Sequence, residues 1–252
     1  MAQKLAKLKK DYYSHLDKKA RYLAHKLSRG IDVTTLILDY IKELYDSAKS
    51  ESNFQNEKFK VAYHNPISSE LEFLIARVLH HYSSSKKLNW MIYLRKQVKK
   101  TAPDIRIERR RKTIAIIEVK AKAGWMQPFF SSERERKDMI KLKERKSDFD
   151  PRELIKKVRK QLKKYYQTYH IASRRVFLFL PSLVLVHREK STRQVEDYEK
   201  DFIRNSDLPR DNLILLSNNL SLDLSSNPSR TEYNPTDRFK NFVSLLSEIS
   251  QQ

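Results

Sequence analysis

Two carboxylates and one amine lie near the middle of the sequence, in a pattern that could bind a cation. Asp104 is followed by thirteen residues, after which Glu118 and Lys120 end an apolar run. Because alternate residues of a strand share a face, Glu118 and Lys120 are expected to point the same way as Ile114 and Ile116. Burying such charges is costly without partners, so this face needs an ion pair, a metal or a substrate.

The spacing predicts that the two carboxylates meet across a hairpin. Residues 104–108 and 113–120 have the composition of strands, and the polar residues 109–112 predict the turn between them. Asp104 is therefore expected beside Glu118. Two close carboxylates repel each other, and a divalent cation removes that repulsion. A surface hairpin with an ordinary ion pair is the alternative.

Helices and further strands are expected around this hairpin. Apolar spacing of three and four residues predicts a helix ending at Gly30, a second after Asp32, a third from about Asn65 to Ser83, and others over residues 152–168 and 238–249. A polar linker is expected over residues 47–57. Strands are predicted over residues 90–98, 176–180, 183–186 and 212–216. The expected class is α/β, with a central mixed sheet between helices and an N-terminal helical hairpin.

The segment from Pro103-Asp104 to Glu118-Val119-Lys120 resembles the motif of the PD-(D/E)xK nuclease superfamily. The resemblance covers about residues 65–180, and the order of the expected elements also resembles that family. A restriction endonuclease-like core is therefore expected. Glu72, in the helix before the strands, resembles the acidic residue of archaeal Holliday-junction resolvases and Mrr-like nucleases, and it fits their spacing better than Glu70. The alternative is that both glutamates flank a buried stripe in solvent.

Gln161 and Tyr165 supply a further match, because they resemble the Gln-x-x-x-Tyr motif of RecB-like members. Their four-residue spacing puts both side chains on one face of a helix. The resemblance implies that Gln161 orients a phosphate or a water, and that Tyr165 supports it by stacking or hydrogen bonding. A solvated helix face is the alternative.

The resemblance implies Mg²⁺-dependent hydrolysis of phosphodiester bonds, with Mn²⁺ as a possible substitute. Asp104, Glu118 and Glu72 would hold the cation, and the carbonyl oxygen of Val119 would complete its ligands. Lys120 would orient or deprotonate the attacking water, or stabilise the charge on the phosphate. The expected products carry 5′-phosphate and 3′-hydroxyl ends.

Composition favours a polyanionic partner. The 252 residues include 52 Lys and Arg against 31 Asp and Glu, a formal charge of +21, so DNA is the first partner to consider and RNA stays open. Further candidates for nucleic-acid contacts are Lys122, Tyr165 and the turn residues Arg109, Arg110 and Arg111. The chain has no cysteine and two glycines, which excludes disulfides and glycine-rich phosphate loops. No apolar run is long enough to cross a membrane, and a cytoplasmic location is expected.

We expect three regions: a basic helical region over residues 1–57, a nuclease core over 58–190 and a C-terminal extension over 191–252 that completes or flanks the core. The function expected is that of a Mg²⁺-dependent DNA endonuclease of restriction or defence type. A RecB-like or resolvase-like repair nuclease and a non-catalytic DNA-binding subunit are the alternatives. Because cutting both strands usually needs two active centres, a homodimer is plausible.

Overall fold

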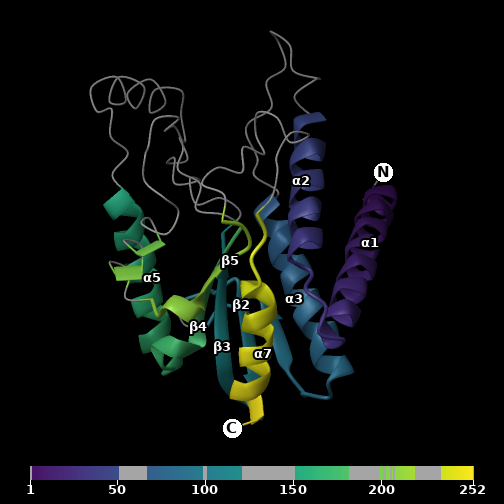
Figure 1. Cartoon of the computed structure of the whole chain (residues 1–252). Helices are drawn as coiled ribbons and strands as arrows, with labels where there is room; N and C mark the ends of the chain where they lie inside the picture. The colour runs from purple at the N-terminus through teal and green to yellow at the C-terminus, as the bar shows by residue number, and fades with distance from the viewer. Residues whose placement is uncertain are drawn as a thin grey trace, which may run out of the picture.

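A five-stranded mixed sheet lies between helices in the computed structural model (Figure 1). The structure describes residues 2–50, 67–98, 101–120, 151–181, 199–200, 203–204, 206, 208–218 and 234–251. Its main helices are α1 (Ala2–Ser28), α2 (Thr34–Ser50), α3 (Ile67–Ser85), α5 (Pro151–Tyr169) and α7 (Arg238–Gln251). The strands are β1 (Met91–Leu94), β2 (Ile105–Arg109), β3 (Lys112–Val119), β4 (Val176–Leu180) and β5 (Leu213–Leu215), and the 3-10 turns η2 (Ser173–Arg175) and η3 (Arg210–Asn212) precede β4 and β5. The predicted α/β class is confirmed.

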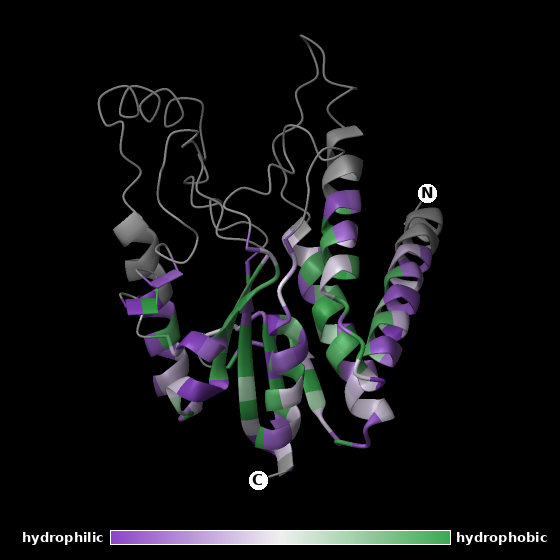
Figure 2. Ribbon diagram, in the orientation of Figure 1, coloured by the Kyte–Doolittle hydropathy of each residue, from purple (hydrophilic) through white to green (hydrophobic). Residues whose placement is uncertain are grey.

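The helices form two layers. One hydrophobic core joins α1, α2, α3 and α7 to one face of the sheet, and a second core joins α5 to the other face. Figure 2 shows the apolar residues of the sheet and of the inward helix faces between these layers. Helix α7 packs directly on the sheet, whereas α1 and α2 pack on α3, which itself lies on the sheet (Figure 1). The division into three regions stays a prediction. No described helix is both long enough and apolar enough to cross a membrane.

The sheet order follows the chain, β1-β2-β3-β4-β5. Strands β1, β2 and β3 pair antiparallel, and β3, β4 and β5 pair parallel. Every residue of β4 is buried: Val176, Leu178 and Leu180 lie in the core with α5, and Phe177 and Phe179 pack on the phenylalanines of α7. Burial on both faces explains why this parallel strand is a continuous apolar run in the sequence.

The first helix ends at Ser28, and Gly30 forms part of its C-terminal cap, as predicted. The N–H of Gly30 donates to the carbonyl of Leu27 at 2.9 Å, and the N–H of Ile31 donates to that of Lys26 at 3.1 Å, which is the pattern of a Schellman cap. Gly30 has φ +78°, a conformation that glycine adopts without steric cost.

The second helix is longer than predicted. Asp32 caps it, because its Oδ1 accepts hydrogen bonds from the N–H and the hydroxyl of Thr34 at 3.3 and 2.8 Å. The helix continues through Ser50, so the linker predicted from residue 47 does not begin there. Ala48 and Lys49 favour a helix and outweigh the neighbouring serines. Residues 51–57 and the strand predicted over 183–186 lie outside the described residues.

A β-bulge changes which side chains share a face of β3. Ile107 pairs with Ala115, but Glu108 pairs with Thr113, so Ile114 is an extra residue without a partner in β2. Ile114 consequently packs in the core with α1 and α3, whereas Ile116 packs in the core with α5. The prediction that both isoleucines share the face of Glu118 is right for Ile116 and wrong for Ile114.

A charged cluster around Asp17 fixes α1 to α3. Its Oδ1 accepts hydrogen bonds from Nε of Arg77 at 2.5 Å and from Nε2 of His81 at 2.8 Å, and Arg21 lies 3.5 Å from Oδ2. Partial burial opposes ionisation of Asp17, but the hydrogen bonds from Arg77 and His81 outweigh it and lower its pKa to about 2. The ionised carboxylate therefore favours the folded state.

Replacing Asp17 with asparagine should destabilise the fold. At neutral pH we expect the free energy of unfolding to fall by about 1–2 kcal/mol, which lowers Tm by about 2–8 °C in thermal unfolding. Because the folded-state pKa is depressed, this contribution is present above the unfolded value of 3.8 and is lost as pH falls through about 2. Asp39→Asn, at an exposed position of α2, is the matched control and should change stability by less than about 0.5 kcal/mol. Equal Tm values for the two variants at pH 7 would contradict the assignment.

Candidate active site

Asp104 and Glu118 meet at one end of the β2–β3 hairpin. Asp104 immediately precedes β2, and the pairing of Ile105 with Ile117 brings it beside the end of β3. Oδ2 of Asp104 accepts a hydrogen bond from the N–H of Val119 at 2.8 Å. The antiparallel register therefore produces the closeness that the thirteen-residue spacing predicts.

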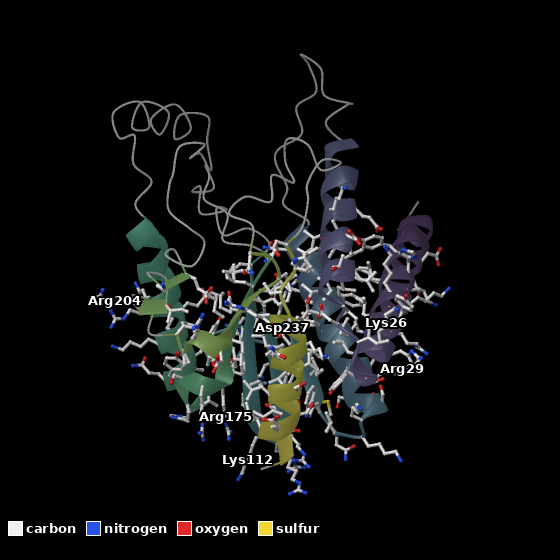
Figure 3. The ribbon with its side chains drawn as sticks, viewed as in Figure 1. Lys26, Arg29, Lys112, Arg175, Arg204 and Asp237 are labelled. Atoms are coloured by element: carbon white, nitrogen blue, oxygen red, sulfur yellow. The ribbon has the colours of Figure 1, made fainter. Side chains whose placement is uncertain are left out.

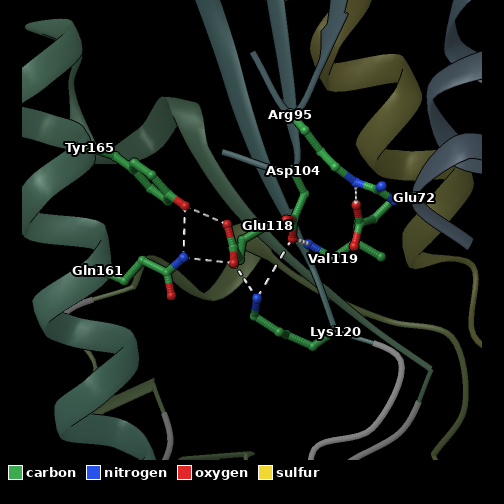
Figure 4. Close-up of polar contacts among 8 residues, drawn as sticks. All are labelled: Glu72, Arg95, Asp104, Glu118, Val119, Lys120, Gln161 and Tyr165. Carbon is green, nitrogen blue, oxygen red and sulfur yellow. Dashed lines mark hydrogen bonds and ion pairs between the residues drawn. The ribbon is translucent and has the colours of Figure 1, made fainter. Parts of the chain in front are cut away.

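Lys120 lies between the two carboxylates (Figure 4). Its Nζ donates to Oε1 of Glu118 and lies 3.6 Å from Oδ2 of Asp104. Both carboxylates thus share one ammonium. The side chain of Glu118 is 4% exposed, so this pairing occurs out of bulk water.

Helix α5 holds Glu118 from the other side. The hydroxyl of Tyr165 donates to Oε2 of Glu118 at 2.6 Å, and Nε2 of Gln161 lies 2.7 Å from both Oε1 of Glu118 and the hydroxyl of Tyr165. Gln161 and Tyr165 therefore lie on one helix face, as their spacing predicts. Tyr165 is 1% exposed, so it cannot stack on a base. Its ring belongs to the apolar face of α5 and its hydroxyl hydrogen-bonds to Glu118, which favours support by hydrogen bonding over stacking; its part in binding nucleic acid stays a prediction.

Glu72, rather than Glu70, faces this site from α3. Burial raises the pKa of Glu72; Arg95 and then Lys120 partly oppose this rise, and Glu118 adds to it. Glu72 thus lies in the electrostatic field of the hairpin residues. Glu70 is oriented differently: its charge acts on tyrosines of α1 and α2, and its Oε2 is buried without a hydrogen-bond partner.

Arg95 is the residue of this site that the sequence does not reveal. Its Nε donates to Oε2 of Glu72 at 2.5 Å, and its N–H donates to the carbonyl of Asp104 at 2.9 Å. It has φ +51°, which ends β1 at Leu94 and makes this strand shorter than the predicted residues 90–98. No sequence signal separates Arg95 from the many other basic residues.

The site brings the carboxyl groups of Asp104, Glu118 and Glu72 together where access to solvent is limited. Burial, and then repulsion by Glu118, raise the pKa of Asp104 to about 8, although Lys120 opposes this rise. Burial disfavours the charge of Lys120, but Glu118 and Asp104 outweigh it and raise the pKa of Lys120 above its usual value. The neighbouring carboxylates therefore stabilise the charge of Lys120, whereas burial and repulsion still favour the protonated form of Asp104.

The donor atoms suit a hard divalent cation. Asp104, Glu118 and Glu72 offer carboxylate oxygens, the ligands that Mg²⁺ and Mn²⁺ prefer. Their mutual repulsion, which adds to burial in raising the pKa of Asp104, is what such a cation would relieve. As the side chains stand, no three His, Asp or Glu residues of the described ranges form a group ready to hold a metal. Lys120 and Arg95 instead supply the positive charge, so a cation would have to replace the ammonium between Asp104 and Glu118.

The structure does not bring all the predicted residues together. Arg109, Arg110 and Arg111 lie at the turn of the hairpin, and a rise of about 3.3 Å per residue puts this turn about 20 Å from Glu118. They are therefore separate from the site. Lys122 lies outside the described residues, and the carbonyl of Val119 as a cation ligand stays a prediction. No protein-family model, no curated protein and no solved structure matches this chain.

Proposed function

We propose that this chain is a Mg²⁺-dependent DNA endonuclease of the PD-(D/E)xK type that hydrolyses phosphodiester bonds, with a role in restriction or defence. The observation that carries the proposal is the single ammonium of Lys120 between the buried carboxylate of Glu118 and the partly buried carboxylate of Asp104. The chain order α3, three antiparallel strands, α5 and a parallel β4 agrees with the core expected for that superfamily. The hydrogen bonds from Gln161 and Tyr165 to Glu118 add support from a third element.

Asp104, Glu118 and Glu72 would hold the cation. When bound, it would supply Lewis-acid stabilisation of the negative charge that develops on phosphate oxygens. Gln161 and Tyr165 would fix the orientation of Glu118, because each lies within 2.7 Å of one of its oxygens. A carboxylate held in this way keeps its position when the charges around it change.

Lys120 would orient the attacking water or donate to a phosphate oxygen. Its raised pKa keeps the amine protonated in the free chain, which favours charge stabilisation over proton abstraction. The side chain is 17% exposed, so the ammonium has access to solvent as well as to the carboxylates. The proposal thus assigns Lys120 a donor role.

Covalently closed circular DNA tests the proposed function. With Mg²⁺ the protein should nick or linearise the circle, and a chelator should stop the reaction. Linear duplex, single-stranded DNA and RNA, assayed in parallel, distinguish the alternatives: cleavage confined to linear ends would indicate a RecB-like exonuclease. Binding to DNA without cleavage of any substrate in Mg²⁺ or Mn²⁺ would contradict the proposal and favour a non-catalytic DNA-binding subunit.

A further inference from the structure

Basic side chains gather at the end of the sheet opposite the candidate active site. We call this surface the basic pole and define it by Lys86, Lys87, Arg109, Arg110, Arg111, Lys112, Arg174 and Arg175. Met91 of β1 pairs with Glu108, and Val176 of β4 pairs with Ile116, so the turns before β1 and β4 lie toward the same end as the β2–β3 turn. Figure 3 shows Lys112 and Arg175 at this end of the molecule.

The charge of the basic pole is not neutralised by neighbouring carboxylates. Within the described ranges, none of its side chains forms an ion pair, and all are exposed or partly exposed. Glu108, the acidic residue next to the turn, is already paired with Arg106 at 2.7 Å. The surface therefore offers several free cationic groups to a partner.

Three of these basic residues occupy backbone conformations that favour glycine or asparagine. Lys87 has φ +53°, and Arg110 and Arg111 have φ +50° and +64°. A two-residue hairpin turn with positive φ at both positions ordinarily carries Asn-Gly, yet this one carries Arg-Arg. Basic side chains at these positions cost stability, which indicates that their charge has a use.

We propose that the basic pole binds the phosphate backbone of double-stranded DNA, separately from the candidate active site. Arginine guanidinium groups match phosphate oxygens in geometry as well as in charge. Binding of a single strand would need exposed aromatic rings for stacking, and a membrane surface would need an apolar face. The exposed tyrosines among the described residues, Tyr12 and Tyr22, belong to α1 and not to the pole.

The geometry separates DNA at the pole from DNA at the candidate active site. The hairpin turn lies about 20 Å along the strand from Glu118, so a straight duplex lying across the pole is not the segment at the carboxylates. The chain would thus contact two DNA segments, or one duplex that bends around it or runs along the strands. This inference does not depend on cleavage, because the pole contains none of the carboxylates.

Arg110→Asn with Arg111→Gly tests the proposal without endangering the fold. Asn-Gly is the sequence that favours a turn with positive φ at both positions, so the Tm of this variant should equal or exceed that of the wild type. Affinity for a short fluorescent DNA duplex, measured in chelator at about 0.05 M salt, should fall about tenfold or more, and the slope of log affinity against log salt should decrease by about 2. Lys86→Gln with Lys87→Asn should also lower the affinity for the duplex. Asparagine tolerates the positive φ of position 87 better than lysine does, so this variant should fold as well.

Lys10→Gln with Lys18→Gln is the matched control, because it removes the same charge from exposed positions of α1 outside the pole. A smaller loss of affinity in this control supports the proposal. An equal loss, or an unchanged affinity in the turn variants, overturns it. A parallel assay with phosphatidylserine vesicles separates a membrane partner: turn variants that lose vesicle binding but keep duplex binding also overturn it.

Discussion

Replacing Lys120 with alanine should lower the rate of DNA cleavage by about 10²- to 10⁴-fold, while binding of duplex DNA persists. Lys120 is the one amine that contacts both Asp104 and Glu118 in the described part of the chain. Its removal deletes the group proposed to donate to water or phosphate. DNA affinity should change little, because the many other basic residues remain. Single-turnover cleavage of circular DNA and a binding assay in Ca²⁺ measure the two quantities separately.

Two further variants distinguish a chemical effect from a loss of folding. Lys120→Ala leaves the buried Glu118 and the partly buried Asp104 without their shared ammonium, so the Tm of this variant should also fall. Lys120→Arg keeps the positive charge and should keep more stability, yet its planar guanidinium is expected to restore little cleavage. Lys163→Ala, at an exposed position of α5, should cleave at the wild-type rate. Full cleavage by folded Lys120→Ala would refute the proposed role.

The sequence predicts most of the site because its residues lie in regular elements or directly beside their ends. The end of α1 follows from Gly30, and the closeness of Asp104 to Glu118 follows from the hairpin spacing. The contact of Gln161 and Tyr165 with Glu118 depends only on helical periodicity and on packing of α5 against the sheet. In each case the residue spacing, together with the packing of one element on its neighbour, was sufficient to predict the contact.

The sequence does not predict features that depend on irregular backbone. The bulge at Ile114 moves this side chain to the other face of β3. Strict alternation of side chains between the two faces of a strand does not predict such a bulge. Arg95 reaches Glu72 from a left-handed conformation that no local sequence signal announces. The separation of Arg109–Arg111 from the site follows from strand length, because a hairpin puts its turn and its open end far apart.

These buried charges need an explanation beyond stability. An ion pair removed from water often stabilises a fold no more than apolar residues of the same size would. The site nevertheless retains Glu118 and Glu72, both more than nine-tenths buried, together with Asp104, whose pKa is raised to about 8. A group of carboxylates whose repulsion is only partly relieved is suited to exchange its internal cations for a metal ion.

Replacing Glu118 with glutamine should remove both cleavage and the response of stability to divalent cations. Wild-type protein that binds Ca²⁺ at a concentration 100 times the Kd gains about 2.7 kcal/mol, which raises Tm by roughly 5–10 °C. Glu118 has the most hydrogen-bond partners of the three carboxylates, so its neutral amide should weaken the cation site most. Thermal unfolding with Ca²⁺ and with chelator measures the shift without any cleavage assay.

Glu43→Gln, at an exposed position of α2, removes the same charge and should keep the full Ca²⁺ shift. Glu118→Gln is itself expected to lower Tm in chelator, because the Tyr165 hydroxyl and the Gln161 amide lose a charged acceptor. The decisive quantity is therefore the difference in Tm between Ca²⁺ and chelator for each variant, since it cancels this loss. A folded Glu118→Gln variant that keeps the full difference would show that the cation binds elsewhere, and the carboxylates between α3 and α5 would then be structural.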